Sequence, residues 1–350
     1  MKKPKLPKVL TRKKNASLDE NAENVPRITN ETIAAHREEV LSSARKYIYP
    51  LQHSKHRIVL ISTTLFITMI VVFFTYCTLA LYKFQSTSTF LYRVTQVIPF
   101  PVARVGSDFV SYESYLFELR HYIHYYETQL KTDFTDPKNQ EQLNEFKKRA
   151  LDKVINDAYV KQLAKHNDVS VPDQEVNNQI TILRTQNRLG GSDKVFEDVL
   201  KDFWGWTVDD FKRSLHQEIL AQKVVAKLDT ETKAKADNVL AQLKAGGDFA
   251  ALAKQNSDDV VTKDNGGEFG FPVDKTNKDL SALTTDALFK LKPGQTSDIV
   301  DIGYALQILK NIEVSGDKIR GAHILFTYKD SGTYVNDLKD KQKARVYIGS

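Results

Sequence analysis

Residues 319–326 of the chain read IRGAHILF, and this short stretch decides how the second half of the chain folds. Apolar residues surround a single histidine, His323, in a pattern that favours a β-strand. The residues before it, SGDK (315–318), are typical of a tight turn, and a second apolar run, GYALQILKNIEV (303–314), precedes that turn. Two strands joined by so short a turn pair as an antiparallel hairpin, so we predict that the strand of His323 pairs with residues 303–314.

The segment upstream of this hairpin alternates short helices, turns and strands. The pattern predicts a helix from residue 231 to the glycines at 246 and 247, a short helix from Phe249, a turn and short strand in NGGEFGF (265–271), a short helix in TDALFKLK (285–292) and a strand up to Asp301. Interleaved short helices and antiparallel strands indicate the α+β class. We therefore expect an antiparallel sheet with surrounding helices.

Four stretches of this segment resemble the parvulin family of peptidyl-prolyl isomerases. They are AGGDFAALAKQNSDD (245–259), GGEFGF (266–271), LFKLKPGQTS (288–297) and IGYALQILK (302–310). A parvulin opens with a strand of the form ASHIL before its first helix, whereas residues 228–230 here run directly from one helix into the next. The resemblance therefore implies a circularly permuted domain over residues 231–327, with its opening strand moved to 319–326. The alternative is a second, truncated repeat, for which the 31 residues from 320 to 350 are too few.

The resemblance also implies the residues of an isomerase site. His323 matches the first family histidine and Asp259 the position of an aspartate or cysteine, while Ala305 stands where a second histidine belongs. The substrate-binding positions implied are Leu280, Leu283, Phe289 and Phe271. Rotation about an X-Pro bond makes and breaks no covalent bond, so we expect neither a metal nor another cofactor. Without the family, His323 would be read as a satisfied core residue and Asp259 as a turn residue.

Residues 99–230 have a different, mainly helical pattern. A hairpin (102–110) and a Ser111 N-cap lead into an aromatic helix, and further helices follow at about 141–167, after Pro172, and twice in 192–228, the last capped by Thr207. This order resembles the N-terminal chaperone domain of SurA-like and PrsA-like foldases, which implies a helical cradle for unfolded polypeptide. His121 and His124 have a spacing that suits a metal, but two histidines are too few, and we favour an exposed polar edge. Trp204 and Trp206 are interpreted as core or peptide-contact residues.

An uncharged apolar run of 25 residues, 58–82, is long enough to cross a bilayer. Residues 1–57 hold 13 Lys and Arg against 6 Asp and Glu, which predicts a cytoplasmic N-terminus and extracytoplasmic domains beyond the span. A cleaved signal peptide is the competing interpretation, weakened by the long leader. We expect residues 1–57 to form a disordered basic tail that binds no nucleic acid, and 83–98 to be a linker. Cys77 is the only cysteine, so the later residues form no disulfide among themselves.

These patterns together predict a single-pass cell-membrane foldase of the α+β class, with a helix or tail over residues 328–350. It would bind unfolded exported polypeptides and catalyse X-Pro isomerisation. A chaperone with a degenerate, non-catalytic parvulin domain is the first alternative, because Ala305 replaces the second histidine. A structural envelope protein that tethers partners through its basic tail is the second.

Overall fold

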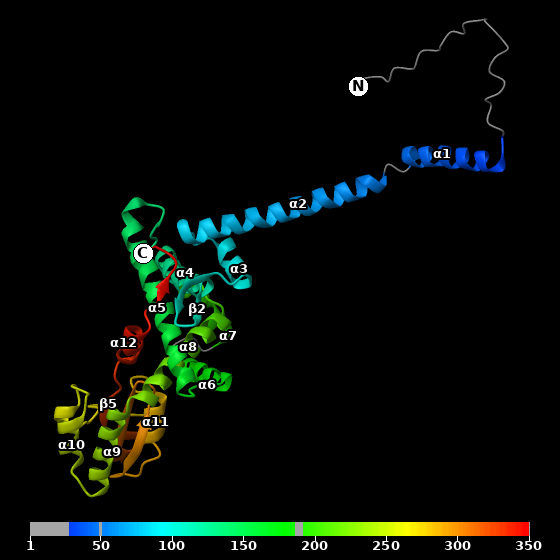
Figure 1. Cartoon of the computed structure of the whole chain (residues 1–350). Helices are drawn as coiled ribbons and strands as arrows, with labels where there is room; N and C mark the ends of the chain where they lie inside the picture. The colour runs from blue at the N-terminus through cyan, green and yellow to red at the C-terminus, as the bar shows by residue number, and fades with distance from the viewer. Residues whose placement is uncertain (1–27, 49–50, 186–191, 350) are drawn as a thin grey trace, which may run out of the picture. The chain divides into compact units, whose positions relative to one another are not determined.

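The computed structural model describes residues 28–48, 51–185 and 192–349. The described residues fall into two compact units, divided between Thr75 and Tyr76. The first unit contains the helix α1 (Asn30–Ile48) and most of α2 (Leu51–Thr78), and α2 runs on into a π-helical turn, η1 (Leu79–Lys83). Figure 1 shows these helices in blue and cyan. Residues 56–83 form a helix long and apolar enough to cross a membrane, which makes it a candidate span.

The expectation of a disordered tail over residues 1–57 is wrong for the part that the structure describes. Residues 30–48 form α1, and α2 already begins at Leu51. Alanine, glutamate, arginine and leucine, which have high helix propensity, make up much of α1, and Glu31 lies in its first turn, where the helix dipole favours a negative charge. The basic residues of the first 27 positions lie outside the described residues.

The second unit begins with a mainly helical part. Its elements are α3 (Thr89–Val97), β1 (Pro101–Val105), β2 (Asp108–Ser111), α4 (Tyr112–Gln129), η2 (Pro137–Asn139), α5 (Gln140–His166), α6 (Asp173–Thr185), α7 (Asp193–Trp204) and α8 (Val208–Leu228). The predicted caps are confirmed: Ser111 accepts a hydrogen bond from the Ser114 N–H, and Thr207 forms a reciprocal capping box with Asp210. The aromatic stripe of α4 is largely buried and forms the core of this part.

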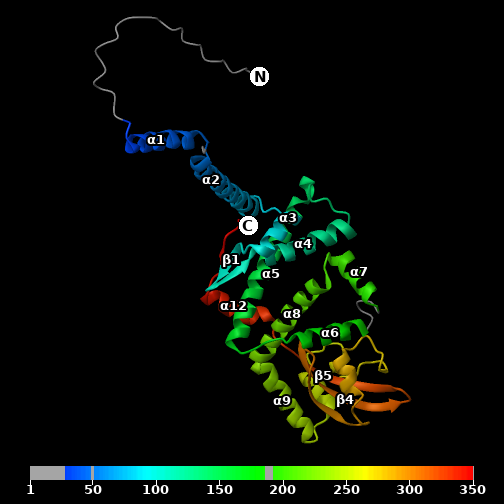
Figure 2. The ribbon, with the colours of Figure 1, turned by 90° about the vertical axis from the view of Figure 1, so that its right-hand side faces the viewer.

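The last residues of the chain return to this helical part. The expected C-terminal helix is α12 (Ser331–Lys341), which packs against α5 and α8 (Figure 2). A short strand, β6 (Arg345–Val346), then adds to β1, so that the small sheet has the order β2-β1-β6. The sequence pattern did not predict this strand, because two residues are too short to show an alternation.

The remaining elements form a sheet part, residues 230–327. They are α9 (Thr230–Lys244), α10 (Phe249–Asn256), η3 (Lys263–Asn265), α11 (Ala282–Leu288), β3 (Thr296–Asp301), β4 (Ala305–Ser315) and β5 (Lys318–Thr327). The sheet is antiparallel in the order β3-β4-β5, with α9, α10 and α11 around it (Figure 1). The predicted hairpin is confirmed, since Ser315 pairs with Lys318 across a two-residue turn that contains Gly316 at φ +62°.

The strand β5 has neighbours on both of its edges. Beyond its pairing with β4, it forms isolated bridges through Ala322 to Glu268 and through Ile319 to Val273. The short strand expected within 265–271 is thus only a pair of bridges, because glycines with positive φ and the following Pro272 interrupt regular pairing. The stretch IRGAHILF consequently lies inside the sheet part. Within IRGAHILF, Arg320 is exposed, Leu325 is half-buried and the other residues are buried.

The chain passes between the helical part and the sheet part twice, and these two crossings lie side by side. Asp229, between α8 and α9, is 1% exposed, and its carboxylate accepts a hydrogen bond from the backbone N–H of Lys329, just after β5, at 2.8 Å. The same carboxylate accepts the Thr232 N–H at 3.2 Å and the Thr232 hydroxyl at 2.9 Å. The end of β5 is therefore held beside the start of α9.

Candidate functional site: a histidine–aspartate pair and a separate cavity

The structure brings together the two residues predicted to be catalytic. His323 lies on β5 opposite Leu309 of β4, and its Nε2 is 2.8 Å from Oδ2 of Asp259, 64 positions earlier in the chain. The side chains are 11% and 20% exposed, respectively, so the pair lies just beneath the surface. This arrangement leaves the pair close enough to solvent for a substrate to reach.

Hydrogen bonds to β5 fix the loop that carries Asp259. The N–H of Asp258 donates to the Leu325 carbonyl at 2.8 Å, and the N–H of Leu325 donates to the Ser257 hydroxyl at 3.1 Å. The Thr327 N–H donates to the Asp258 carboxylate at 2.8 Å. The loop after α10 is thereby attached to the strand of His323, which sets the distance between the two site residues.

Thr262 is a third member of the site that the sequence did not single out. Its hydroxyl donates to Oδ2 of Asp259 at 2.6 Å and lies 3.1 Å from Nε2 of His323. Thr262 follows Asp259 by three residues, a spacing at which a turn brings side chains together, and this was the signal available in the sequence.

The protonation of the pair follows from burial and hydrogen bonding. Burial lowers the pKa of His323, and the hydrogen bond and charge of Asp259 offset this only in part. Burial raises the pKa of Asp259, but hydrogen bonds from Thr262, His323 and the Val261 N–H outweigh it and leave the pKa lowered. At neutral pH the site therefore holds a neutral imidazole beside a carboxylate.

Apolar side chains surround the imidazole on its other side. The ring of Phe269 lies 4.8 Å from that of His323, and Phe271 lies 6.2 Å from Phe269, both measured between ring centroids. Of the four predicted substrate-binding residues, Leu280 and Phe289 pack against the core cluster that contains Phe269. Phe271 and Leu283 are exposed. The first pair thus belongs to the apolar core next to Phe269, and the second pair lies at the surface.

Ala305 is fully buried, and the polar residue near it on β4 is Gln307, which is 1% exposed. The Gln307 amide lies between His323, whose Nδ1 is 3.5 Å from Oε1, and Thr284, whose hydroxyl oxygen accepts from Nε2 at 2.5 Å. The sequence reasoning missed this residue. A glutamine within the apolar run ALQIL was the available signal, because a buried amide requires partners.

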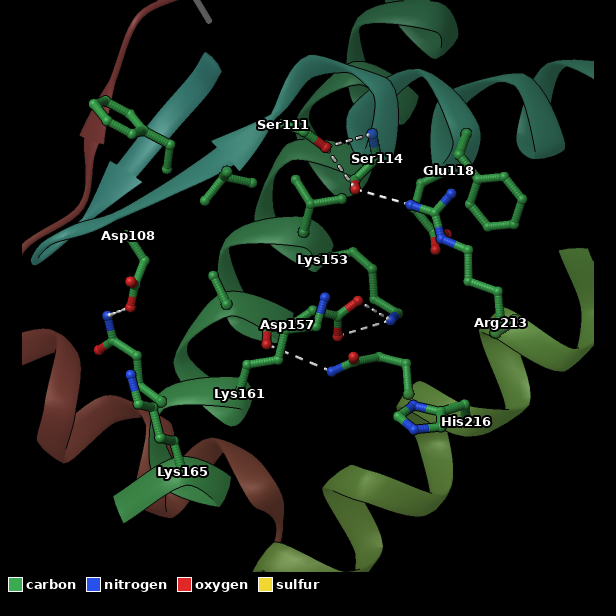
Figure 3. Close-up of a pocket in the computed structure, with 18 residues that line it drawn as sticks. Asp108, Ser111, Ser114, Glu118, Lys153, Asp157, Lys161, Lys165, Arg213 and His216 are labelled. Atoms are coloured by element: carbon green, nitrogen blue, oxygen red, sulfur yellow. Dashed lines mark hydrogen bonds and ion pairs between the residues drawn. The ribbon is translucent and has the colours of Figure 1, made fainter. Parts of the chain in front are cut away.

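A separate cavity of about 560 Å³ lies in the helical part, between β2, α4, α5 and α8. Figure 3 shows polar side chains around it, with Lys153 paired to Asp157 at 2.7 Å. Arg213 pairs with Glu113 at 2.6 Å. Apolar residues also line it: Phe109, Val110, Phe117, Val154 and Ala158. Apolar walls with charges of both signs suit a polypeptide segment of mixed sequence.

In the helical part, the aromatic residues near His121 and His124 form a stack. Trp206 lies 5.4 Å from Phe117 and 4.6 Å from His121 between ring centroids, with small interplanar angles. Burial lowers the pKa of His121 to about 4. The prediction of an exposed polar edge is therefore wrong for His121, whose ring packs against an indole, whereas His124 contacts the Asp202 carbonyl at 3.2 Å.

Comparisons with known proteins match both parts of the chain. Residues 52–225 match the model of the SurA-like N-terminal domain, and residues 212–315 match that of the PPIC-type PPIASE domain. The second match ends before β5, so the strand of His323 lies outside it.

Individual relatives carry the same two names. The foldase protein PrsA of Lacticaseibacillus paracasei is 36% identical over 120 residues, 34% of this chain and 36% of that protein. The chaperone SurA of Thiobacillus denitrificans is 38% identical over 88 residues, 25% of this chain and 19% of that protein. A crystal structure of the peptidylprolyl isomerase PrsA from Bacillus anthracis is 20% identical and covers 53% of this chain and 86% of that one, with a TM-score of 0.19.

The chain thus matches about a third of the length of the PrsA relative and a fifth of the SurA relative. The two family models match the chain in the expected order, the SurA-like domain before the PPIC-type domain, and both support the same family. The chain is a SurA/PrsA-like protein, with a SurA-like N-terminal domain followed by a PPIC-type peptidyl-prolyl isomerase domain.

Proposed function

We propose that the protein is a membrane-anchored foldase that binds unfolded exported polypeptides and catalyses the cis/trans isomerisation of X-Pro bonds. The observation that carries the catalytic proposal is the contact of 2.8 Å between His323 and Asp259, beside Phe269. A twisted amide loses its conjugation, so a site that favours it over both planar forms lowers the rotational barrier. A polar pair next to an apolar surface offers hydrogen bonding to the peptide and contact for the proline ring.

The sheet part is proposed to be a circularly permuted parvulin domain over residues 231–327, preceded by a chaperone domain over 99–230. Two observations support this. The Lys329 N–H bonds to Asp229, so the end of β5 adjoins the start of α9, where a parvulin's opening strand would lead. The match to the isomerase domain also stops at residue 315, as expected if the opening strand has moved to the other end.

The apolar helix of residues 56–83 is proposed to be the membrane anchor. The excess of Lys and Arg before it supports a cytoplasmic N-terminus, which would place the chaperone and isomerase domains outside the membrane. Clients would then be chains that have just been exported.

An isomerisation assay on the full chain in detergent micelles tests the catalytic proposal. With an X-Pro peptide, the unmodified protein is expected to accelerate isomerisation, and His323→Ala and Asp259→Ala are each expected to lower kcat/KM by about 10- to 100-fold, because each removes one half of the polar pair. His36→Ala, in the exposed helix α1, is the matched control and should keep full activity. If the unmodified protein does not accelerate isomerisation, the catalytic proposal is wrong and the non-catalytic chaperone is the function.

The cavity of the helical part is the proposed client site. Ala158 on α5 lines it, so Ala158→Trp should fill it and weaken the binding of an unfolded client by about tenfold, a change of 1.4 kcal/mol. Asp152→Trp places the same side chain at an exposed position of α5 and should leave binding unchanged. Client affinity can be measured by fluorescence anisotropy. Equal affinity of the two variants would contradict the assignment of the cavity.

A further inference from the structure

A buried glutamine contacts the proposed catalytic histidine from the neighbouring strand. Gln307 of β4 is 1% exposed and lies among apolar residues of the sheet core. An unpaired amide at such a position destabilises the fold, so the contacts of Gln307 matter to stability. Those contacts are His323 on one side, at 3.5 Å, and the Thr284 hydroxyl on the other, at 2.5 Å.

The hydrogen bonds on the far side of the imidazole show which nitrogen carries a proton. The hydroxyl of Thr262 has one hydrogen, which it donates to Asp259 at 2.6 Å. Its oxygen, 3.1 Å from Nε2 of His323, is then free to accept, as is the carboxylate of Asp259 at 2.8 Å. Nε2 therefore carries a hydrogen that both oxygens can accept.

The other nitrogen, Nδ1, faces the amide of Gln307. In a neutral ring with a proton on Nε2, Nδ1 is an acceptor and needs a donor. In the structure the amide oxygen faces Nδ1 and the amide nitrogen faces Thr284. The amide supplies a donor to Nδ1 when it is turned by 180°, and its oxygen then accepts from the Thr284 hydroxyl, which can donate as well as accept. In a protonated ring, the orientation seen in the structure places the amide oxygen against Nδ1–H. Gln307 can therefore form a hydrogen bond with Nδ1 in both the neutral and the protonated state of the histidine.

We propose that Gln307 is a positioning residue for His323, which fixes the imidazole from the Nδ1 side and keeps Nε2–H directed at Asp259. Side chains two apart on a strand share a face, so Gln307 lies on the same face of β4 as Ala305, where the second family histidine is missing. The effect on catalysis rests on the proposed isomerase function, whereas the effect on the imidazole rests on the contact alone.

The experiment is ¹⁵N NMR of the imidazole of His323 in the full chain, labelled at histidine and held in detergent micelles. Gln307→Leu removes the amide with little change in volume, so the Nδ1 resonance should move toward that of a nitrogen without a hydrogen bond, and kcat/KM should fall about tenfold. Gln307→Glu places an anion beside the ring and should raise the pKa of His323. Asp259 is the charged group that already faces the ring, and Thr262 and Phe269 beside it are neutral.

Asn311→Leu is the matched control. Asn311 is also a buried amide of β4, and it donates to the Leu291 carbonyl at 2.9 Å rather than to the histidine. Its loss should destabilise the sheet without moving the resonances of His323. An unchanged Nδ1 resonance in Gln307→Leu, or an equal shift in Asn311→Leu, would overturn the proposal. The NMR result decides this even if the unmodified protein proves inactive, an outcome that would refute only the proposed catalysis.

Discussion

Replacing Asp229 with alanine is expected to lower the free energy of unfolding by about 3–5 kcal/mol. The carboxylate is 1% exposed and accepts hydrogen bonds from the Lys329 N–H, the Thr232 N–H and the Thr232 hydroxyl. Alanine leaves these donors without their acceptor at the place where both chain crossings meet. Urea unfolding followed by circular dichroism measures the loss.

Asp330→Ala is the matched control for this variant, because Asp330 is an exposed aspartate next to the same crossing. Its side chain caps α12 by accepting the Gly332 N–H at 2.7 Å, and its removal should cost only about 1 kcal/mol. A loss for Asp229→Ala no larger than that of the control would contradict the role of the buried carboxylate.

The stability that Asp229 contributes should also depend on pH. Burial raises the pKa of Asp229, but the hydrogen bonds from Lys329 and Thr232 outweigh it, so the folded pKa is lowered. Its contribution is then complete above the unfolded value of about 3.9 and is lost as the pH falls through the folded pKa. Asp229→Ala should therefore show a weaker dependence of stability on pH below 4.

Replacing Gly267 with alanine is expected to lower the free energy of unfolding by about 3–5 kcal/mol and to impair the site at the same time. Gly267 has φ +81°, and a Cβ there would collide with the backbone carbonyl of His323. Its own carbonyl accepts the His323 N–H at 2.8 Å, so relief of the collision must move the strand that carries the histidine. Urea unfolding and the isomerisation assay measure the two effects.

Gly270→Ala separates backbone strain from the collision. Gly270 has φ +80°, almost the same as Gly267, but a Cβ there would have no atom within 4 Å. It should cost about 1–2 kcal/mol, the strain of a left-handed residue alone, and leave His323 in place. Equal losses of unfolding free energy in the two variants would show that the close approach to His323 is not the reason why position 267 requires glycine.

Much of the fold follows from local patterns in the sequence. The Ser111 and Thr207 caps, the turn at Gly316 and the apolar runs on either side of it each have a short-range physical signal, and each was confirmed. The polar composition of residues 30–48 is typical of disorder and so does not predict α1, and the two residues of β6 are too few to show a periodicity.

The sequence by itself determined the α+β class, the β4–β5 hairpin and the identity of His323 and Asp259 as a candidate pair, because helix caps, turns and family motifs are local in the chain. The tertiary structure alone decided that β5 has neighbours on both edges, that Asp229 joins the two crossings, and that Thr262 and Gln307 flank the histidine. These contacts join residues far apart in the chain, and burial determines which polar side chains must find a partner there.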